Sequence, residues 1–231
     1  IYGYTPRLCK NYLYEGDEPS AFKAEITEDD IAAEKSKEGA ETFPEAYLES
    51  LALFRKLCDY TLKHAEGMIF HSSAIAVDGK GYLFTAPSGT GKSTHARLLK
   101  ELLGDRLVYI NDDKPIIRLV DCKFYVYGTP WNGKHHLDTN ARAEIAAICE
   151  VRRGKENSIE KLTPKDMLAV AFNQTLRPES ADDMDKYLTL LDKLLNSVGL
   201  YRLHCNISEE AAEVSYGEMI KGNEKGADNE D

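Results

Sequence analysis

The sequence predicts an α/β fold of the mixed α+β type, with a strand, a glycine-rich loop and a helix in direct succession near its centre. Short runs of β-forming residues alternate with amphipathic helical runs along the chain. Turn signals such as Asp78-Gly79 join neighbouring strands as hairpins. The length of 231 residues suits one large domain, alone or with a small appendage, and allows a sizeable core.

Residues 1–66 are expected to add strands and one helix that pack on this core. Leu8–Tyr14 and Ala21–Ile26 have the composition of short strands. The run Thr42-Phe43-Pro44-Glu45 has the form of a capping box, with Thr42 as the N-cap and Glu45 reaching back. This predicts a helix that runs to about His64, with apolar residues at helical spacing on one face.

Residues 67–221 are expected to form the main domain, and the polar run 222–231 a disordered tail. The expected strands are Met68–Val77, Tyr82–Thr85, Leu107–Ile110, Lys114–Val120, Phe124–Tyr127, Ile145–Val151, Ser158–Leu162 and Tyr201–Cys205. The expected helices are Lys92–Leu103, one that begins at Thr163-Pro164, Asp182–Ser197 and Ser208–Lys221.

Composition and charge exclude several classes of function. A formal net charge of −10 gives no electrostatic reason to bind a nucleic-acid backbone. The five cysteines are scattered and include no C-x-x-C pair, which argues against a disulfide framework and a cysteine zinc site. No apolar run has membrane-spanning length and no signal peptide is visible, so we expect a cytoplasmic protein that binds neither membrane nor nucleic acid.

The strongest motif is Ala86-Pro87-Ser88-Gly89-Thr90-Gly91-Lys92-Ser93-Thr94, placed between a strand and an amphipathic helix. This is the context of a P-loop, in which backbone N–H groups and the helix N-terminus surround phosphate oxygens. We expect Ser88–Thr94 to bind nucleotide, with Lys92 at the β- and γ-phosphates and Ser93 as a Mg²⁺ ligand. The strict pattern has glycine where this chain has Ala86, so either φ is negative there or the loop is adjusted.

Asp112 and Asp113 directly follow a predicted strand. Two carboxylates at a strand end suit a metal ligand and a catalytic base, although Asn111-Asp112-Asp113 is also good turn chemistry. If the strand continued through them, the two side chains would point to opposite sides. His71, on the strand before the loop, is either close to the phosphates or an ordinary sheet histidine.

The run Gly128–His136 contains glycines, one tryptophan and cationic groups, as in a mobile binding loop. Lys134 could neutralise a transferring phosphate. His135 and His136 are adjacent, and adjacent side chains on an extended segment point apart, which disfavours a shared metal. Arg152 and Arg153 fit a solvated surface better than a phosphate clamp.

The ordered set Phe70-His71-Ser72-Ser73, Pro87–Thr94 and Ile110-Asn111-Asp112-Asp113 resembles the catalytic domain of HPr kinase/phosphorylase and the nucleotide core of ATP-dependent phosphoenolpyruvate carboxykinase. The run Gly128-Thr129-Pro130-Trp131-Asn132-Gly133-Lys134 resembles the small HPr-kinase-like proteins of that superfamily. The resemblance covers roughly residues 68–162, and it implies a P-loop, kinase-like core with a mixed β-sheet and flanking helices.

The resemblance also implies roles for single residues. Lys92 and Ser93 would bind phosphate and Mg²⁺, the aspartates would serve metal binding and base chemistry, and His71 would lie near the reacting groups. We favour Asp113 as the metal ligand and Asp112 as the base, with Lys134 as a further catalytic residue. Residues 1–66 do not resemble the N-terminal domain of HPr kinases, and the family's acceptor-side motif is not recognisable.

The leading hypothesis is therefore an ATP- and Mg²⁺-dependent kinase that transfers phosphate to a hydroxyl. The acceptor is left open as a serine of a protein or peptide, or a small metabolite. Two other interpretations are a nucleotide-binding regulatory module with little turnover and a hydrolase that uses water as acceptor. The choice between ATP and GTP and a possible homo-oligomer are also open.

Overall fold

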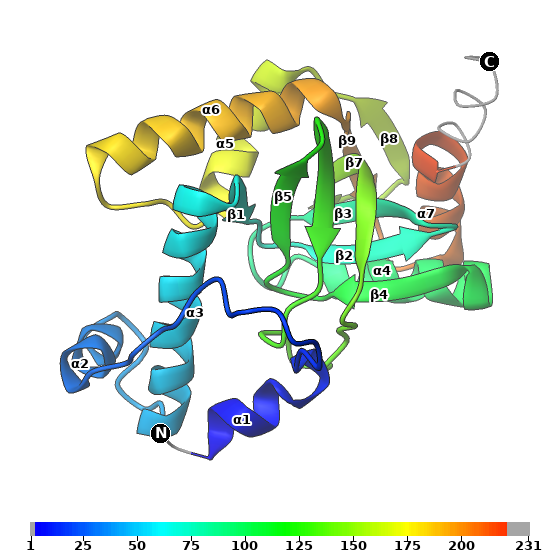
Figure 1. Cartoon of the computed structure of the whole chain (residues 1–231). Helices are drawn as coiled ribbons and strands as arrows, with labels where there is room; N and C mark the ends of the chain where they lie inside the picture. Colours follow the sequence, from blue (N-terminus) through cyan, green and yellow to red (C-terminus); the bar gives the residue numbers. More distant parts are fainter. Residues whose placement is uncertain (1–2, 221–231) are drawn as a thin grey trace.

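The structure, a computed structural model, describes residues 3–220, and its centre is one curled β-sheet (Figure 1). In the described residues this sheet has nine strands, with the order β1-β5-β6-β7-β3-β2-β4, β9 beside β7 and β8 beside β9. The strands are β1 (Gly67–Ile69), β2 (Ser73–Val77), β3 (Lys80–Thr85), β4 (Leu107–Asn111), β5 (Ile116–Val120), β6 (Lys123–Tyr127), β7 (Arg142–Arg153), β8 (Ser158–Lys161) and β9 (Gly199–Cys205).

Strand β7 joins the parts of the sheet. It pairs in parallel with β3 on one side. On the other side its start pairs antiparallel with β6 and its end pairs in parallel with β9. Because one strand has neighbours of both directions, the sheet is mixed. The predicted mixed α+β fold with flanking helices is confirmed.

Helices cover both faces of the sheet. Helices α5 (Pro164–Gln174) and α6 (Ala181–Ser197) pack on one face around Leu83 and Ile148. Helices α4 (Lys92–Leu103) and α7 (Glu209–Ser215) pack on the other face around Phe84 and Cys149. Neighbouring residues of one strand thus enter different cores, as strand alternation requires. The expected helix starts at Lys92 and Thr163 are confirmed, the second with a capping box from Asp166.

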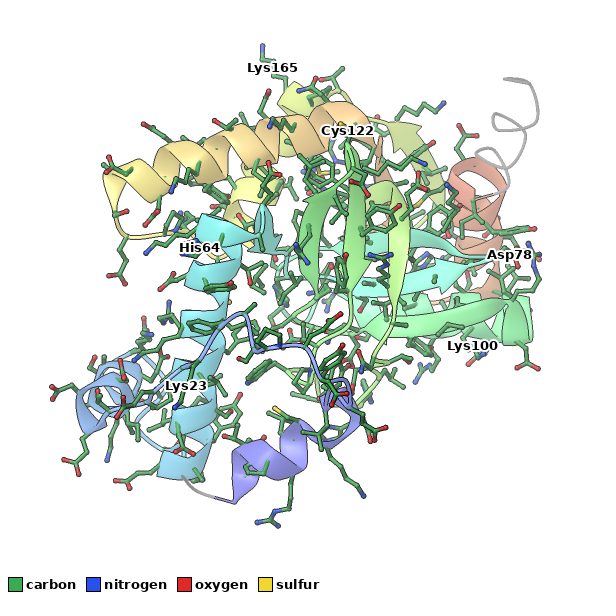
Figure 2. All side chains as sticks on the ribbon, viewed as in Figure 1. Lys23, His64, Asp78, Lys100, Cys122 and Lys165 are labelled. Atoms are coloured by element: carbon green, nitrogen blue, oxygen red, sulfur yellow. The ribbon has the colours of Figure 1, made fainter. Side chains whose placement is uncertain are left out.

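Two-residue hairpin turns form where the sequence predicts them. Asp78 and Gly79 join β2 to β3, and Asp121 and Cys122 join β5 to β6. All four residues have positive φ, from 48° to 83°, which matches the twist of antiparallel strands. Asp78 lies at the right-hand side of the view and Cys122 near the top of the green strands, so the two turns are well apart (Figure 2).

The N-terminal segment differs from the expectation of strands. Within Leu8–Tyr14 the chain forms the last residue of α1 (Tyr4–Leu8) and the 3-10 turn η1 (Lys10–Tyr12). Ala21–Ile26 has no regular structure. The helices α2 (Glu28–Lys35) and α3 (Glu45–His64) follow. In Ala21–Ile26 side chains of α3 bind the backbone: the Tyr60 hydroxyl donates to Ala21 O at 3.0 Å and Lys56 Nζ to Glu25 O at 2.7 Å. In Leu8–Tyr14 local bonds form helical turns instead, from Cys9 N–H to Thr5 O and from Tyr12 N–H to Cys9 O.

The start of α3 also differs from the predicted capping box. The N-cap is Pro44, with no side-chain cap, instead of Thr42. Proline disfavours helical backbone at the residue before it, so Phe43 cannot belong to the helix. Glu45 is then the first helical residue and cannot reach back as predicted. The end near His64 is confirmed.

The expected strand Met68–Val77 is interrupted at residues 70–72. His71 N–H donates to Gln174 O at 2.7 Å and Ser72 N–H to Asp113 O at 3.3 Å. Neither N–H group therefore takes part in the strand pairing of the sheet. Strand β1 then pairs with β5, whereas β2 pairs with β3 and β4. The interruption places His71 between separate parts of the sheet.

Other expectations concern the termini, the thiols and the membrane. Helix α7 is followed by a π-helical turn, η3 (Tyr216–Ile220), and the predicted tail 222–231 lies outside the described residues. All five cysteines are free, as predicted. Across residues 3–220, every helix is too short or too polar to span a bilayer. The division into residues 1–66 and 67–221 stays a prediction.

The core between α4 and α7 contains a titratable group, His95. It is 2% exposed, and its Nε2 lies 2.9 Å from the Ser215 hydroxyl, which itself donates to Ala212 O. Nε2 therefore carries the proton and donates. Burial lowers the pKa of His95 from 6.5 to about 4.

We predict that His95 makes the fold sensitive to acid. Between about pH 6.5 and 4 the unfolded chain binds a proton that the folded chain excludes, so the free energy of unfolding falls as the pH falls. The loss is on the order of 2–3 kcal/mol. Urea unfolding of wild type and His95→Gln across this range measures it. His64→Gln, at the exposed end of α3, is the control. Equal pH dependence of all three chains would contradict the prediction.

Candidate active site

The glycine-rich loop connects β3 to α4, and two of its glycines have positive φ. Gly89 has φ of 77° and Gly91 has φ of 129°, values that an L-residue rarely adopts. Ala86 is fully buried and is not among the residues with positive φ. Alanine in the first position of the motif is therefore unstrained, and the first of the two alternatives for Ala86 is confirmed.

The side chain of Lys92, the first residue of α4, points back into the glycine-rich loop. Its Nζ donates to Ala86 O at 2.9 Å, and the residue is 7% exposed. Burial lowers the pKa of Lys92, and the charge of Asp113 partly opposes that shift. The next side chain, Ser93, has its hydroxyl 3.3 Å from that of Ser73 on β2.

Strand β4 ends at Asn111, and the side chain of this residue builds the turn that follows. Its Oδ1 accepts the N–H groups of Asp113 at 2.8 Å and Lys114 at 2.7 Å. Its Nδ2 donates to Thr129 O at 2.9 Å. Because the strand stops here, the alternation argument does not apply, and Asp112 and Asp113 line the same cavity.

Asp112 is buried with one carboxylate oxygen unpaired. Oδ1 accepts the backbone N–H of Gly133 at 2.5 Å, whereas Oδ2 is buried and lacks a hydrogen-bond partner in the described residues. A Cβ on Gly133 would lie 2.9 Å from Oδ2, so a side chain at this position would force the Asp112 carboxylate to shift. Burial and the charge of Asp113 raise the pKa of Asp112, against the lowering effect of the Gly133 N–H.

Asp113 has the opposite electrostatic environment. His71 Nε2 lies 3.2 Å from Oδ1, and Lys114 Nζ pairs with Oδ2. Burial acts to raise the pKa of Asp113, but His71 and Lys114 outweigh it and lower the pKa to about 2. The other ring nitrogen of His71, Nδ1, lies 2.9 Å from Gln174 Oε1. The ring is thus held between α5 and the aspartate turn.

The loop after β6 closes the site. Trp131 anchors it, since its Nε1 donates to Ser50 O of α3 at 3.1 Å and its ring lies 4.8 Å from that of Phe54. Two residues later Gly133 reaches Asp112. Lys134 and His135 are exposed at the rim of the cavity.

These elements surround a cavity of about 400 Å³. Of the predicted site residues, those that line it are His71, Ser88, Gly89, Gly91, Lys92, Ser93, Thr94, Asp112, Asp113 and Lys134. Thr90 instead lines a cavity of about 500 Å³ on the other side of the loop, which shares Gly89, Gly91 and Thr94 with the first.

The oxygen donors of the cavity suit Mg²⁺. Mg²⁺ is usually held by one or two carboxylates together with phosphate oxygens and water. Asp112 Oδ2 is a buried oxygen without a partner, and Ser73 lies between Ser93 Oγ, at 3.3 Å, and Asp112 O, at 3.5 Å. No group of three or more His, Cys, Asp or Glu suited to a metal occurs in residues 3–220.

Several residues that shape the site were not singled out from the sequence. Asn111 is the last residue of β4, and the sequence indicated it only as part of a possible turn with Asp112 and Asp113, not as the residue whose side chain builds that turn. Gln174 gives no signal, because its contact with His71 joins residues 103 apart. Arg153, expected on a solvated surface, donates to Gly89 O at 2.5 Å and Thr90 O at 3.2 Å, and so braces the loop.

Comparisons with known proteins give distant likenesses among solved structures alone. No family model matches the sequence, and no curated protein matches it. Among solved structures, the chain is similar to the HPr(Ser) kinase/phosphatase from Coxiella burnetii, with 9% identity, a TM-score of 0.39, and coverage of 71% of this chain and 99% of that chain. At this level of likeness the function has to be inferred from the site residues.

The unpaired oxygen of Asp112 leads to a stability prediction. Its pKa is higher in the folded than in the unfolded chain, so ionisation lowers the free energy of unfolding as the pH rises. At pH 7 and without ligands, Asp112→Asn should stabilise the fold by about 1 kcal/mol, or roughly 2–4 °C in Tm. Differential scanning calorimetry measures this. Asp105→Asn, at a fully exposed aspartate, should leave Tm unchanged. A lower Tm for Asp112→Asn would contradict the prediction.

Proposed function

We propose that this chain is an ATP- and Mg²⁺-dependent kinase that transfers the γ-phosphoryl group to a hydroxyl. The observation that carries the proposal is the single cavity in which the P-loop meets two aspartates of unlike environment. Phosphoryl transfer depends on positioning and charge neutralisation, and these groups supply both.

The geometry of the loop supports the placement of the nucleotide. The phosphates would lie at Gly89–Ser93, against the positive N-terminus of α4. On binding, Lys92 would exchange its contact with Ala86 O for phosphate oxygens. The 500 Å³ cavity on the other side of the loop continues from the same glycines and has room for the nucleoside.

The two aspartates support different roles, and the assignment reverses the one favoured by the sequence. Asp112 offers a buried carboxylate oxygen without a hydrogen-bond partner in the described residues. Its backbone O lies 3.5 Å from Ser73 Oγ, which lies 3.3 Å from Ser93 Oγ, so we assign Asp112 and Ser93 to Mg²⁺. Asp113 is oriented by His71, whose ring is fixed by Gln174, so we assign the hydroxyl proton to Asp113. A low pKa is compatible with this role, because the transition state is loose and positioning dominates.

The chemistry then follows from these residues. Mg²⁺ bound with the nucleotide would neutralise phosphate charge. Asp113 would hold the acceptor hydroxyl in line and accept its proton, with His71 keeping the carboxylate oriented. Lys92 would stabilise the leaving phosphate, and Lys134 at the rim would approach the transferring group. The five free thiols favour a reducing compartment such as the cytoplasm.

The first test is nucleotide binding. ATP or ADP with Mg²⁺ at 100 times its Kd should stabilise the fold by about 2.7 kcal/mol. In a thermal-shift assay Lys92→Ala should lose most of this stabilisation, because the phosphates lose a cation. Lys134→Ala should keep it and reduce turnover instead. No shift with any nucleoside di- or triphosphate would refute the proposal.

The second test separates binding from transfer. Asp113→Asn should bind Mg²⁺–ATP normally but transfer phosphate about 10²–10⁴-fold more slowly, as expected for loss of a general base. Asp112→Asn should weaken nucleotide binding only when Mg²⁺ is present. Calorimetric titration and a labelled-ATP assay measure the two effects. If both variants transfer at the parental rate, the kinase proposal is wrong and the regulatory nucleotide-binding module replaces it.

A further inference from the structure

A cavity of about 460 Å³, distinct from the 400 Å³ phosphate cavity and the 500 Å³ cavity, shares residues with the phosphate cavity, and we call it the second cavity. His71 and Asp113 line both cavities, whereas Asp112 lines only the phosphate cavity. The second cavity lies between α3, β1 and the end of α5. A molecule held there would meet the nucleotide phosphates at His71 and Asp113.

One wall of this second cavity is apolar. It consists of Leu51 and Phe54 from α3, Ile69 from β1 and Leu176. Phe54 and Ile69 are each 6% exposed and belong to the small core that holds Trp131. The wall is therefore rigid, and it is continuous with the anchor of the loop that reaches Asp112.

Arg55, also on α3 and four residues after Leu51, lines the same cavity. Its Nε donates to Glu34 Oε1 at 2.6 Å, and its side chain is 35% exposed. Within residues 3–220 the terminal guanidinium nitrogens have no hydrogen-bond partner. Burial acts to raise the pKa of Glu34, but Arg55 and Lys37 lower it overall, so the carboxylate is charged and fixes the guanidinium in place. A fixed fork of N–H donors suits a carboxylate.

We infer that the second cavity binds the phosphoryl acceptor, and that the acceptor is a small hydroxy carboxylate with an apolar part. This inference rests on the proposed kinase function. The hydroxyl lies at Asp113, the carboxylate at the Arg55 fork and the apolar part against Phe54 and Leu51. The volume falls within the range of small-molecule sites, about 300–1,000 Å³.

The reaction in this arrangement balances. The hydroxyl oxygen forms a bond to the γ-phosphorus while the bond from that phosphorus to the β,γ-bridging oxygen breaks. ADP leaves with the electron pair, and the hydroxyl proton passes to Asp113. The products are a phosphomonoester of the hydroxy carboxylate and ADP. The helices before the P-loop core thus supply the acceptor side of the site.

The test measures kcat/KM for matched acceptors in a labelled-ATP assay. The probes are L-threonine, 3-hydroxybutyrate and 3-phenyllactate, each compared with its carboxamide, and a peptide with an internal serine. At least one carboxylate should exceed its carboxamide at least tenfold with wild type. Arg55→Gln should lose that preference through a higher KM, while its thermal shift with Mg²⁺–ATP stays parental.

Two further variants keep the test decisive. Arg55→Lys retains the charge that pairs with Glu34 but lacks the fork, so it should fold and still raise KM for the carboxylate. Arg97→Gln makes the same charge change at an exposed arginine of α4 and should behave as wild type.

The outcomes separate this inference from the proposed function. Phosphorylation of carboxylate and carboxamide at equal rates, unchanged KM in both Arg55 variants, or preference for the peptide would overturn the inference and leave the kinase intact. Nucleotide binding without transfer to any probe would refute the small hydroxy-carboxylate acceptor. The kinase proposal itself fails only if the Asp112→Asn and Asp113→Asn variants both transfer phosphate at the parental rate, or if no nucleotide binds.

Discussion

The site depends on the side chain of Asn111. This buried amide accepts two backbone N–H groups of the turn and donates to the loop after β6. These bonds hold the backbone of the turn at the end of β4, where pairing with β2 stops. They thereby place Asp112 and Asp113 in one cavity. Neither alanine nor leucine can supply these bonds, so the positions of both carboxylates follow from one polar residue without a net charge.

Two adjacent carboxylates in one cavity repel each other, and the structure gives them different hydrogen-bond and charge partners. Asp113 receives a histidine and a lysine, whereas Asp112 receives one backbone N–H and keeps an unpaired oxygen. The polypeptide therefore pairs both oxygens of the Asp113 carboxylate but only one oxygen of the Asp112 carboxylate. This difference between the two carboxylates is the reason why we propose Asp112, and not Asp113, for a cation.

Local patterns in the sequence predicted the parts of the fold that depend on neighbours in the chain. The hairpin turns and α4 are of this kind, because glycine, aspartate and apolar spacing determine them. Ala21–Ile26 was predicted wrongly because its backbone partners are side chains of α3, such as Tyr60, far along the sequence. The pairing of His71 with Gln174 depends on the same kind of long-range contact, so the sequence indicated the histidine but not what orients it.

The indole of Trp131 has a consequence for how this architecture can vary. It fastens the loop that carries Gly133 to the backbone of α3 at Ser50, while Phe54 of the same helix packs on the ring. A change in the position of α3 would therefore be transmitted to the hydrogen bond on Asp112. A sequence change that moves α3 therefore has to preserve the contacts of Trp131 with Ser50 and Phe54 if Gly133 is to keep its place at Asp112.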